Sequence, residues 1–280
     1  ADGSVKLVDT GAVARVPNLA IHLTRGADQG IDRQVHLQPI VGGNLPLSEL
    51  VARAAGVDAG EIVAHELISA DTQPAAVVGD SVMSGRLDNL SSVFASVQAL
   101  LRAQDSAEDV LVLAAFNHEE VGSASTTGAG GPLLERLLAR ITASLGDPLD
   151  FYTGSLAVSA DAAHSVHPNY PGKHDPTHRP LLGKGPVLKV NANQRYASDA
   201  VSSAAWIRAA RAANVPVQTF VGHNDVPCGS TIGPISATRL GIPTVDVGVP
   251  LLSMHSAREQ VGVQDMAWFT EALAAFLRGD

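Results

Sequence analysis

Carboxylate side chains follow directly on two of the strands that this 280-residue sequence predicts. Glu119 and Glu120 come after the apolar run Val110–Phe116, and Asp161 comes after the aliphatic run Leu156–Ser159. In open α/β sheets, ligands bind outside the carboxyl ends of the strands. We therefore expect these three carboxylates to converge on one site.

Two further residues extend this group. Asp88 precedes a predicted helix, and His255 follows the predicted strand Thr244–Val247 and its loop. Carboxylates packed together repel, and their burial is costly unless a cation compensates. Oxygen and imidazole ligands suit zinc, manganese or cobalt, and two such ions would need a bridging ligand. In such a site, one of the adjacent residues Glu119 and Glu120 could bind metal while the other takes a proton from water.

Each of these residues also has an ordinary structural interpretation. A Glu-Glu pair is most often solvated, Asp88 could simply cap its helix, and a lone histidine such as His255 is usually structural or exposed. Cys228 is better explained as a packed small thiol than as a nucleophile, and the Gly- and Ser-rich segment 122–128 lacks the lysine of a phosphate loop. Spacing alone therefore leaves the metal site and the structural interpretation both open.

The elements that must position these residues indicate an α/β fold. Short aliphatic runs alternate with longer helical patterns, which favours a mostly parallel sheet flanked by helices. Besides the two runs named above, strands are predicted at Val187–Val190, Val217–Val221 and Thr244–Val247. Apolar residues at three- and four-residue spacing predict helices at Asn89–Arg102, Leu133–Ser144, Asp199–Ala213 and Gln264–Arg278.

Residues 1–80 have a different pattern, in which Gly, Pro and Asn punctuate short apolar runs. The segment 71–80 contains Pro74 and Gly79 and could link two domains, so a boundary is expected near residue 81. Before it, the pattern predicts one helix and three strands, at Ser48–Ala55 and at Leu19–Leu23, Val35–Ile40 and Ile62–Ser69 respectively.

Composition excludes several classes of protein. Hydrophobic residues make up 45% of the chain and charged residues 17%, which excludes disorder and predicts a sizeable core. A net charge of −9 argues against nucleic-acid binding, and no apolar run approaches the ~20 residues that span a bilayer. The single cysteine excludes an internal disulfide, and no signal peptide is visible. We therefore predict a cytoplasmic protein with no nucleic-acid or membrane partner.

Seven segments, in order along nearly the whole chain, carry motifs that are individually weak and together specific. They are Arg15–Leu23, Ser84–Leu90, Asn117–Ser123, Asp161–Tyr170, Gly185–Lys189, Asn224–Pro234 and Ser253–Glu259. Together these segments resemble the aspartyl aminopeptidases, a family of two-metal exopeptidases. The resemblance implies a zinc-exopeptidase-like α/β catalytic domain with an inserted β-rich oligomerisation domain. On this chain the two would correspond to residues 81–280 and to a partial domain at residues 1–80.

The resemblance also implies a role for each residue of the expected metal site. Asp88 would bridge two divalent ions, most simply zinc, with manganese or cobalt as alternatives. Glu120 and His255 would complete one ion, and Asp161 would belong to the other. Glu119 would be the general base.

Substrate recognition and assembly follow from the same resemblance. Lys189 would be the cation that meets the acidic side chain of the substrate's N-terminal residue, since a lysine in a pocket prefers an anionic partner. His22 would reach into the active site of a neighbouring subunit, and His164 and Tyr196 would line the pocket. Members of the family form dodecamers built from dimers.

One departure from the family pattern concerns a further metal-binding histidine, in a His-Thr-Asp-Ser-Pro-type segment that precedes the oligomerisation domain. This chain begins inside that domain, so we expect the natural protein to be longer. Three hypotheses result: a metal-dependent aminopeptidase that releases N-terminal Asp or Glu, a catalytically silent assembly subunit that lacks one metal ligand, and an aminopeptidase of broader, neutral specificity.

Overall fold

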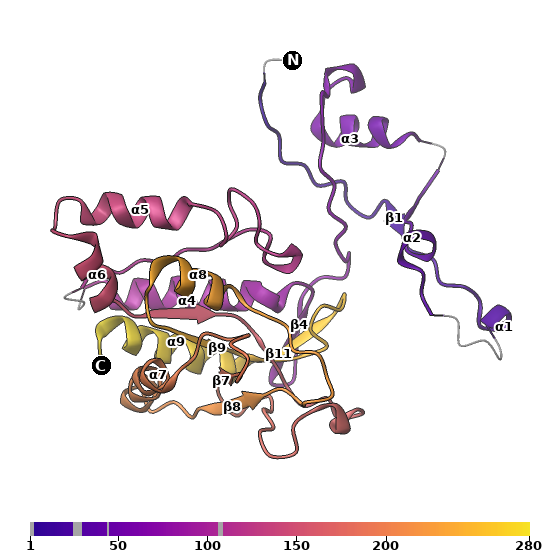
Figure 1. Cartoon of the computed structure of the whole chain (residues 1–280). Helices are drawn as coiled ribbons and strands as arrows, with labels where there is room; N and C mark the ends of the chain where they lie inside the picture. The colour runs from indigo at the N-terminus through magenta and orange to yellow at the C-terminus, as the bar shows by residue number, and fades with distance from the viewer. Residues whose placement is uncertain (1–2, 25–29, 44, 106–108) are drawn as a thin grey trace. The chain divides into compact units, whose positions relative to one another are not determined.

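The computed structural model describes residues 3–24, 30–43, 45–105 and 109–280. The chain divides into two compact units, Ala1–Thr72 and Gln73–Asp280 (Figure 1). This division lies before the boundary expected near residue 81, because strand β3 (Ala76–Val78) pairs with β4 (Ser81–Ser84) of the second unit.

The first unit is built from short elements: β1 (Ala14–Arg15), α1 (Ile21–Thr24), α2 (Arg33–His36), β2 (Ile40–Val41), α3 (Leu47–Ala55) and η1 (Ala59–Glu61). The helix predicted at Ser48–Ala55 is confirmed by α3, which ends at the left-handed Gly56.

The strand predictions in this unit are largely wrong. Leu19–Leu23 overlaps α1, most of Val35–Ile40 lies in or next to α2, and Ile62–Ser69 contains no strand. An apolar run becomes a strand only where a partner satisfies its backbone groups, and among the described residues only the short pair β1–β2 offers this in the first unit.

The second unit contains a four-stranded sheet in the order β5-β9-β7-β8. Its strands are β5 (Ala157–Ala160), β7 (Val187–Val190), β8 (Gln218–Val221) and β9 (Thr244–Gly248). They confirm four of the predicted strands to within a residue or so. The β5–β9 and β7–β8 pairs are parallel, as predicted, and the β7–β9 pair is antiparallel.

A five-stranded sheet that the sequence patterns did not predict lies in the same unit, in the order β3-β4-β11-β10-β6. It adds β6 (Ala163–His164), β10 (Pro250–Leu252) and β11 (Glu259–Gly262) to β3 and β4. Antiparallel pairing of β4 with β11 brings residues 81–84 against residues 259–262. This pairing joins the segment before Asp88 to the segment after His255.

Helices pack against the four-stranded sheet (Figure 1). The four predicted helices are confirmed by α4 (Leu87–Ala103), α5 (Leu133–Thr142), α7 (Ala200–Ala212) and α9 (Val263–Arg278), and α6 (Pro148–Gly154) and α8 (Ile232–Leu240) add to them. Buried alanines on α4 and α9 let these two helices pack closely. No helix in the described ranges is both long and apolar enough to cross a membrane.

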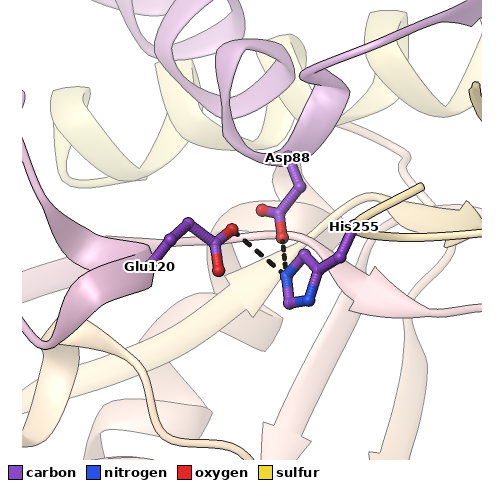
Figure 2. A group of neighbouring side chains, drawn as sticks. All are labelled: Asp88, Glu120 and His255. Carbon is purple, nitrogen blue, oxygen red and sulfur yellow. Dashed lines mark hydrogen bonds and ion pairs between the residues drawn. The ribbon is translucent and has the colours of Figure 1, made fainter. Parts of the chain in front are cut away.

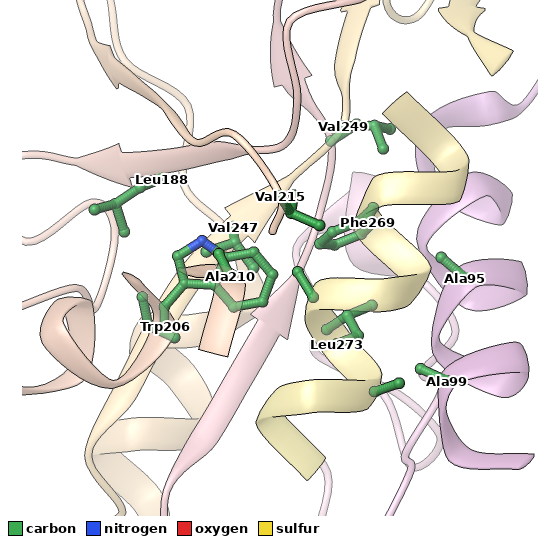
Figure 3. Packing of buried hydrophobic residues seen from close by; sticks show 14 of the residues in the cluster. Ala95, Ala99, Leu188, Trp206, Ala210, Val215, Val247, Val249, Phe269 and Leu273 are labelled. Atoms are coloured by element: carbon green, nitrogen blue, oxygen red, sulfur yellow. The ribbon is translucent and has the colours of Figure 1, made fainter. Parts of the chain in front are cut away.

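Hydrophobic residues are buried on both faces of the four-stranded sheet, in a large cluster on one face and in a smaller cluster of Ala163, Val187, Tyr196 and Phe220 on the other. Val245 and Val247 of β9 pack in the same buried cluster as Trp206 of α7 and Phe269 of α9, whose rings meet edge to face (Figure 3). Alternate residues of a strand point to opposite faces. Asp246, between the two valines, accordingly meets Thr231 at the start of α8.

The prediction of a buried strand at Val110–Phe116 is wrong. These residues form no strand, and Val110 keeps 61% of its surface exposed. The residues of this run are of the types that favour strands, but no strand among the described residues pairs with them. Without a partner to satisfy its N–H and C=O groups, an aliphatic segment does not become a strand.

Candidate metal centre

Three of the predicted metal ligands come together. Nε2 of His255 lies 3.0 Å from Oδ2 of Asp88 and 3.1 Å from Oε1 of Glu120 (Figure 2). One potential ligand atom from each residue falls within 4.8 Å of the others. Burial lowers the pKa of His255, but the charges of Glu120 and Asp88 outweigh it and raise that pKa above its usual value.

Irregular backbone positions each of these side chains. Asp88 is the second residue of α4 but has extended dihedrals, φ −84° and ψ 107°. The alternative interpretation of Asp88 as the helix cap is therefore wrong. The residue at the cap is Arg86, which makes no side-chain hydrogen bond there. Glu120 lies in the 3₁₀ turn η2 (Glu119–Val121), and His255, with φ 64°, lies in the turn between β10 and β11. The Asp88 carboxylate is thus free to face His255.

Asp161 lines the same cavity but has a different partner. Nζ of Lys189 donates to Oδ2 of Asp161 at 2.8 Å and to the carbonyl of Ala162 at 3.0 Å. The Lys189 side chain is almost fully buried, and its ammonium lies 5.2 Å from the centre of the Tyr196 ring. The lysine that the family resemblance implies for substrate recognition is therefore also the internal counter-ion of Asp161.

One cavity of about 300 Å³ gathers most of the predicted site. Its lining includes Asp88, Glu119, Glu120, Asp161, His164, Lys189, Tyr196 and His255. His22 is exposed on α1 in the first unit and is not among these residues. The structure thus brings together the site residues that lie beyond residue 80.

Burial and neighbouring negative charges raise the pKa values of two acids in this cavity. Burial, followed by the charges of Asp161 and Glu120, raises the pKa of Glu119 to about 7. The same three causes, in the same order, raise the pKa of Asp88 to about 7. Perturbed acids of this kind cluster at functional sites.

The pocket residues Tyr196 and His164 respond to their surroundings as well. Burial raises the pKa of the Tyr196 hydroxyl, and its neighbour Cys228, a free thiol, contributes to the rise. Desolvation, and then the Lys189 cation, lowers the pKa of His164. Both side chains therefore enter the cavity as neutral groups at neutral pH.

A divalent cation fits the cluster of Asp88, Glu120 and His255. Oδ1 of Asp88 is buried and has no hydrogen-bond partner, which is costly for a carboxylate oxygen unless a cation or donor meets it. Two carboxylates and one imidazole are a donor set that zinc accepts, and three protein ligands are typical of catalytic zinc sites.

Two residues that sequence reasoning missed support this cluster. Glu259 is buried on β11 and accepts hydrogen bonds from the amides of Asp88 and His255. Nδ2 of Asn89 donates to the carbonyl of Ala160 at 2.7 Å and ties the start of α4 to the end of β5. Because no strand is predicted at residues 259–262, the sequence pattern contains no signal for the burial of Glu259.

Taken together, the fold and the site define an α/β metalloprotein with a carboxylate–histidine centre. Residues 3–277 match the family described as aminopeptidase I zinc metalloprotease (M18). The chain is 45% identical, over 99% of its length, to a probable M18 family aminopeptidase 2 of Streptomyces coelicolor. The chain belongs to this M18 family of zinc metalloproteases.

Solved structures agree with this assignment. A structure of the Ape4 and Nbr1 complex covers 95% of the chain with a TM-score of 0.88 and 35% identity. The mApe1 dodecamer of Saccharomyces cerevisiae covers 98% of the chain with a TM-score of 0.80 and 26% identity. The chain spans 68% of the Streptomyces relative, 57% of the Ape4-complex chain and 66% of the mApe1 chain.

Proposed function

We propose that this chain carries the catalytic site of a metal-dependent aminopeptidase. The observation that carries the proposal is the cluster of Asp88, Glu120 and His255 beside Glu119 in one cavity. Family membership supports both the divalent metal, zinc, and the aminopeptidase chemistry.

Asp88, Glu120 and His255 would hold the zinc ion. Bound there, zinc would supply a Lewis acid that polarises the scissile carbonyl and acidifies water. Glu119 would accept the proton of the attacking water and pass it to the leaving amine, a task for which an acid with a pKa near the working pH is suited.

A second divalent ion is part of the proposal. Asp88, whose Oδ1 has no hydrogen-bond partner, would serve both ions, and Asp161 would help to hold the second ion. Asp161 already shares its Oδ2 with Lys189, so the described residues offer the second ion fewer free ligand atoms than the first. Manganese or cobalt could replace zinc, because both accept the same ligand types.

The finer proposal concerns specificity for N-terminal Asp or Glu. Lys189 lines the cavity and uses two of its three ammonium protons for Asp161 and Ala162. The third proton would bind the acidic side chain of the substrate, with His164 and Tyr196 shaping the pocket around it. If the internal contacts leave Lys189 no proton to donate to the substrate, the enzyme would instead accept neutral N-terminal residues more broadly.

Assembly completes the proposal. Residues 1–80 would form part of an oligomerisation domain through which the chain builds a homo-oligomer, by analogy with the mApe1 dodecamer. His22 would then serve the active site of a neighbouring subunit. A cytoplasmic location suits the free thiol of Cys228, since free thiols persist in reducing compartments.

The test is hydrolysis of chromogenic amides of Asp, Glu, Leu and Lys by the 280-residue chain, with zinc, manganese or cobalt added to EDTA-treated protein. The proposal predicts release from Asp and Glu amides that requires metal. Release from Leu amides alone would favour neutral specificity. Zinc binding without hydrolysis of any amide would favour the silent assembly subunit. The shortage of metal ligands around Asp161 is the observation that supports this alternative.

A further inference from the structure

Glu259 is a buried carboxylate that the proposed chemistry does not use. It begins β11, keeps 2% of its surface exposed and pairs across the sheet with Ser84 of β4. A buried carboxylate is costly unless hydrogen bonds satisfy its oxygens. The partners of Glu259 therefore reveal what its burial achieves.

Each oxygen of Glu259 binds the backbone of a different cluster residue. The amide of Asp88 donates to Oε2 at 2.9 Å, and the amide of His255 donates to Oε1 at 2.7 Å. Asp88 and His255 are separated by 167 positions in the chain. One buried side chain thus links two distant segments at the point where they present their ligand atoms.

Neither backbone segment would hold its position through regular secondary structure. Asp88 lies in the first turn of α4, where amides have no partner within the helix, and its dihedrals are extended. His255 has φ 64°, in the left-handed region that a residue with a side chain seldom adopts. The Glu259 carboxylate supplies the hydrogen bonds that the regular elements do not.

From this geometry we infer that Glu259 is a positioning residue, which fixes the separation of Asp88 and His255 at the value a divalent cation requires. It acts through the two ligands and need not touch the ion or the substrate. The inference rests on the proposed function in one respect, namely that the cluster of Asp88, Glu120 and His255 binds a cation.

Asp265 provides a matched control within the same unit. It is fully buried at the start of α9, and its two oxygens accept the amides of Gly183 at 2.6 Å and Gly185 at 2.8 Å. Glu259→Gln and Asp265→Asn make the same chemical change, since each replaces one acceptor oxygen with an NH₂ group that faces an amide. Both variants should lower the melting temperature, but only Glu259→Gln should alter the cluster of Asp88, Glu120 and His255.

The experiment is a zinc titration of the metal-free 280-residue chain, with affinity measured by competition against a chromogenic chelator. Loss of a group that orients metal ligands typically weakens metal affinity about 10–100-fold. We expect this loss for Glu259→Gln and a change of less than about threefold for Asp265→Asn. Equal zinc affinity of Glu259→Gln and the unaltered chain would overturn the inference.

Two further outcomes are informative. If the unaltered chain binds no zinc, the proposed function fails and the inference fails with it, whereas a defect confined to the variant leaves the function intact. If Glu259→Gln does not fold, hydrogen exchange on the unaltered, metal-free chain replaces it. The amides of Asp88 and His255 should then be protected from exchange, and rapid exchange of both would overturn the inference.

Discussion

The cavity has carboxylates on two sides, and these carboxylates have different partners: His255 on one side and Lys189 on the other. On the histidine side, Asp88 and Glu120 face a half-exposed imidazole, and one Asp88 oxygen has no partner. On the lysine side, Asp161 is neutralised by the buried ammonium of Lys189. Removing one partner of a buried ion pair destabilises a fold, whereas an imidazole and an unpartnered carboxylate oxygen can coordinate an external ion. We therefore expect metal affinity to depend on the histidine side and fold stability to depend on the lysine side.

Glu119 lines the same cavity, and its burial, followed by the charges of Asp161 and Glu120, raises its pKa to about 7. Glu119→Gln should reduce metal-dependent amide hydrolysis by about 10²–10⁴-fold, as loss of a general base does, while zinc affinity stays unchanged. Steady-state kinetics and zinc titration measure the two effects. Glu120→Gln is the control, and it should lose zinc affinity. Full activity of a zinc-loaded Glu119→Gln would refute the role of Glu119.

Lys189→Met tests the lysine side. It leaves the Asp161 carboxylate without its cation, which for a buried pair costs about 3–5 kcal/mol. Urea unfolding in EDTA measures the loss, and the exposed Lys184→Met should change stability by less than about 0.5 kcal/mol. The double variant Asp161→Asn/Lys189→Met should recover part of the stability. A stable Lys189→Met would show that the pair contributes nothing to the fold.

His255→Ala tests the histidine side. Removing a direct ligand should weaken zinc binding by more than the ~100-fold that loss of an orienting group costs, while the unfolding free energy of the metal-free chain changes by about 1 kcal/mol or less. Zinc titration and urea unfolding check both expectations. His178→Ala, which removes a histidine paired with Asp175 and absent from the cavity lining, should leave zinc affinity unchanged.

Asp199 is a carboxylate outside the cavity whose role is structural. It caps α7 by accepting the amide of Ser202 at 2.7 Å, and this hydrogen bond lowers its pKa. Asp199→Ala should cost about 1 kcal/mol. Because the folded-state pKa is lowered, this contribution is present above the ordinary aspartate pKa of about 3.9 and is lost as pH falls through the lowered value. Urea unfolding of the unaltered chain and of Asp199→Ala, at pH 7 and below pH 3, measures this contribution. An equal loss of unfolding free energy at both pH values would contradict the capping role of the Asp199 carboxylate.

The local sequence pattern predicted the elements whose periodicity and buried face are clear in the sequence. The strand at Val187–Val190 and the long helices were predicted closely, since each has a clear periodicity and a buried face. Val110–Phe116 and Leu19–Leu23 were predicted as strands from residue type alone. Strand formation depends on hydrogen-bonding partners elsewhere in the chain, which a local pattern does not contain.

The candidate site likewise has a part that the sequence predicts and a part that it does not. The convergence of Asp88, Glu120 and His255 followed from residues at element ends, and the structure confirms that these side chains meet. The pairing of Lys189 with Asp161 and the two hydrogen bonds of Glu259 could not be predicted. Both depend on which strands become neighbours, and the antiparallel pair β4–β11 had no signal in the sequence.

The most direct test of the central claim is anomalous diffraction at the zinc edge from crystals of the 280-residue chain grown with zinc. We predict a peak bound by Asp88, Glu120 and His255, with zinc–oxygen and zinc–nitrogen distances of about 2.0–2.2 Å. Absence of a peak at these residues in crystals that contain zinc elsewhere would contradict the account.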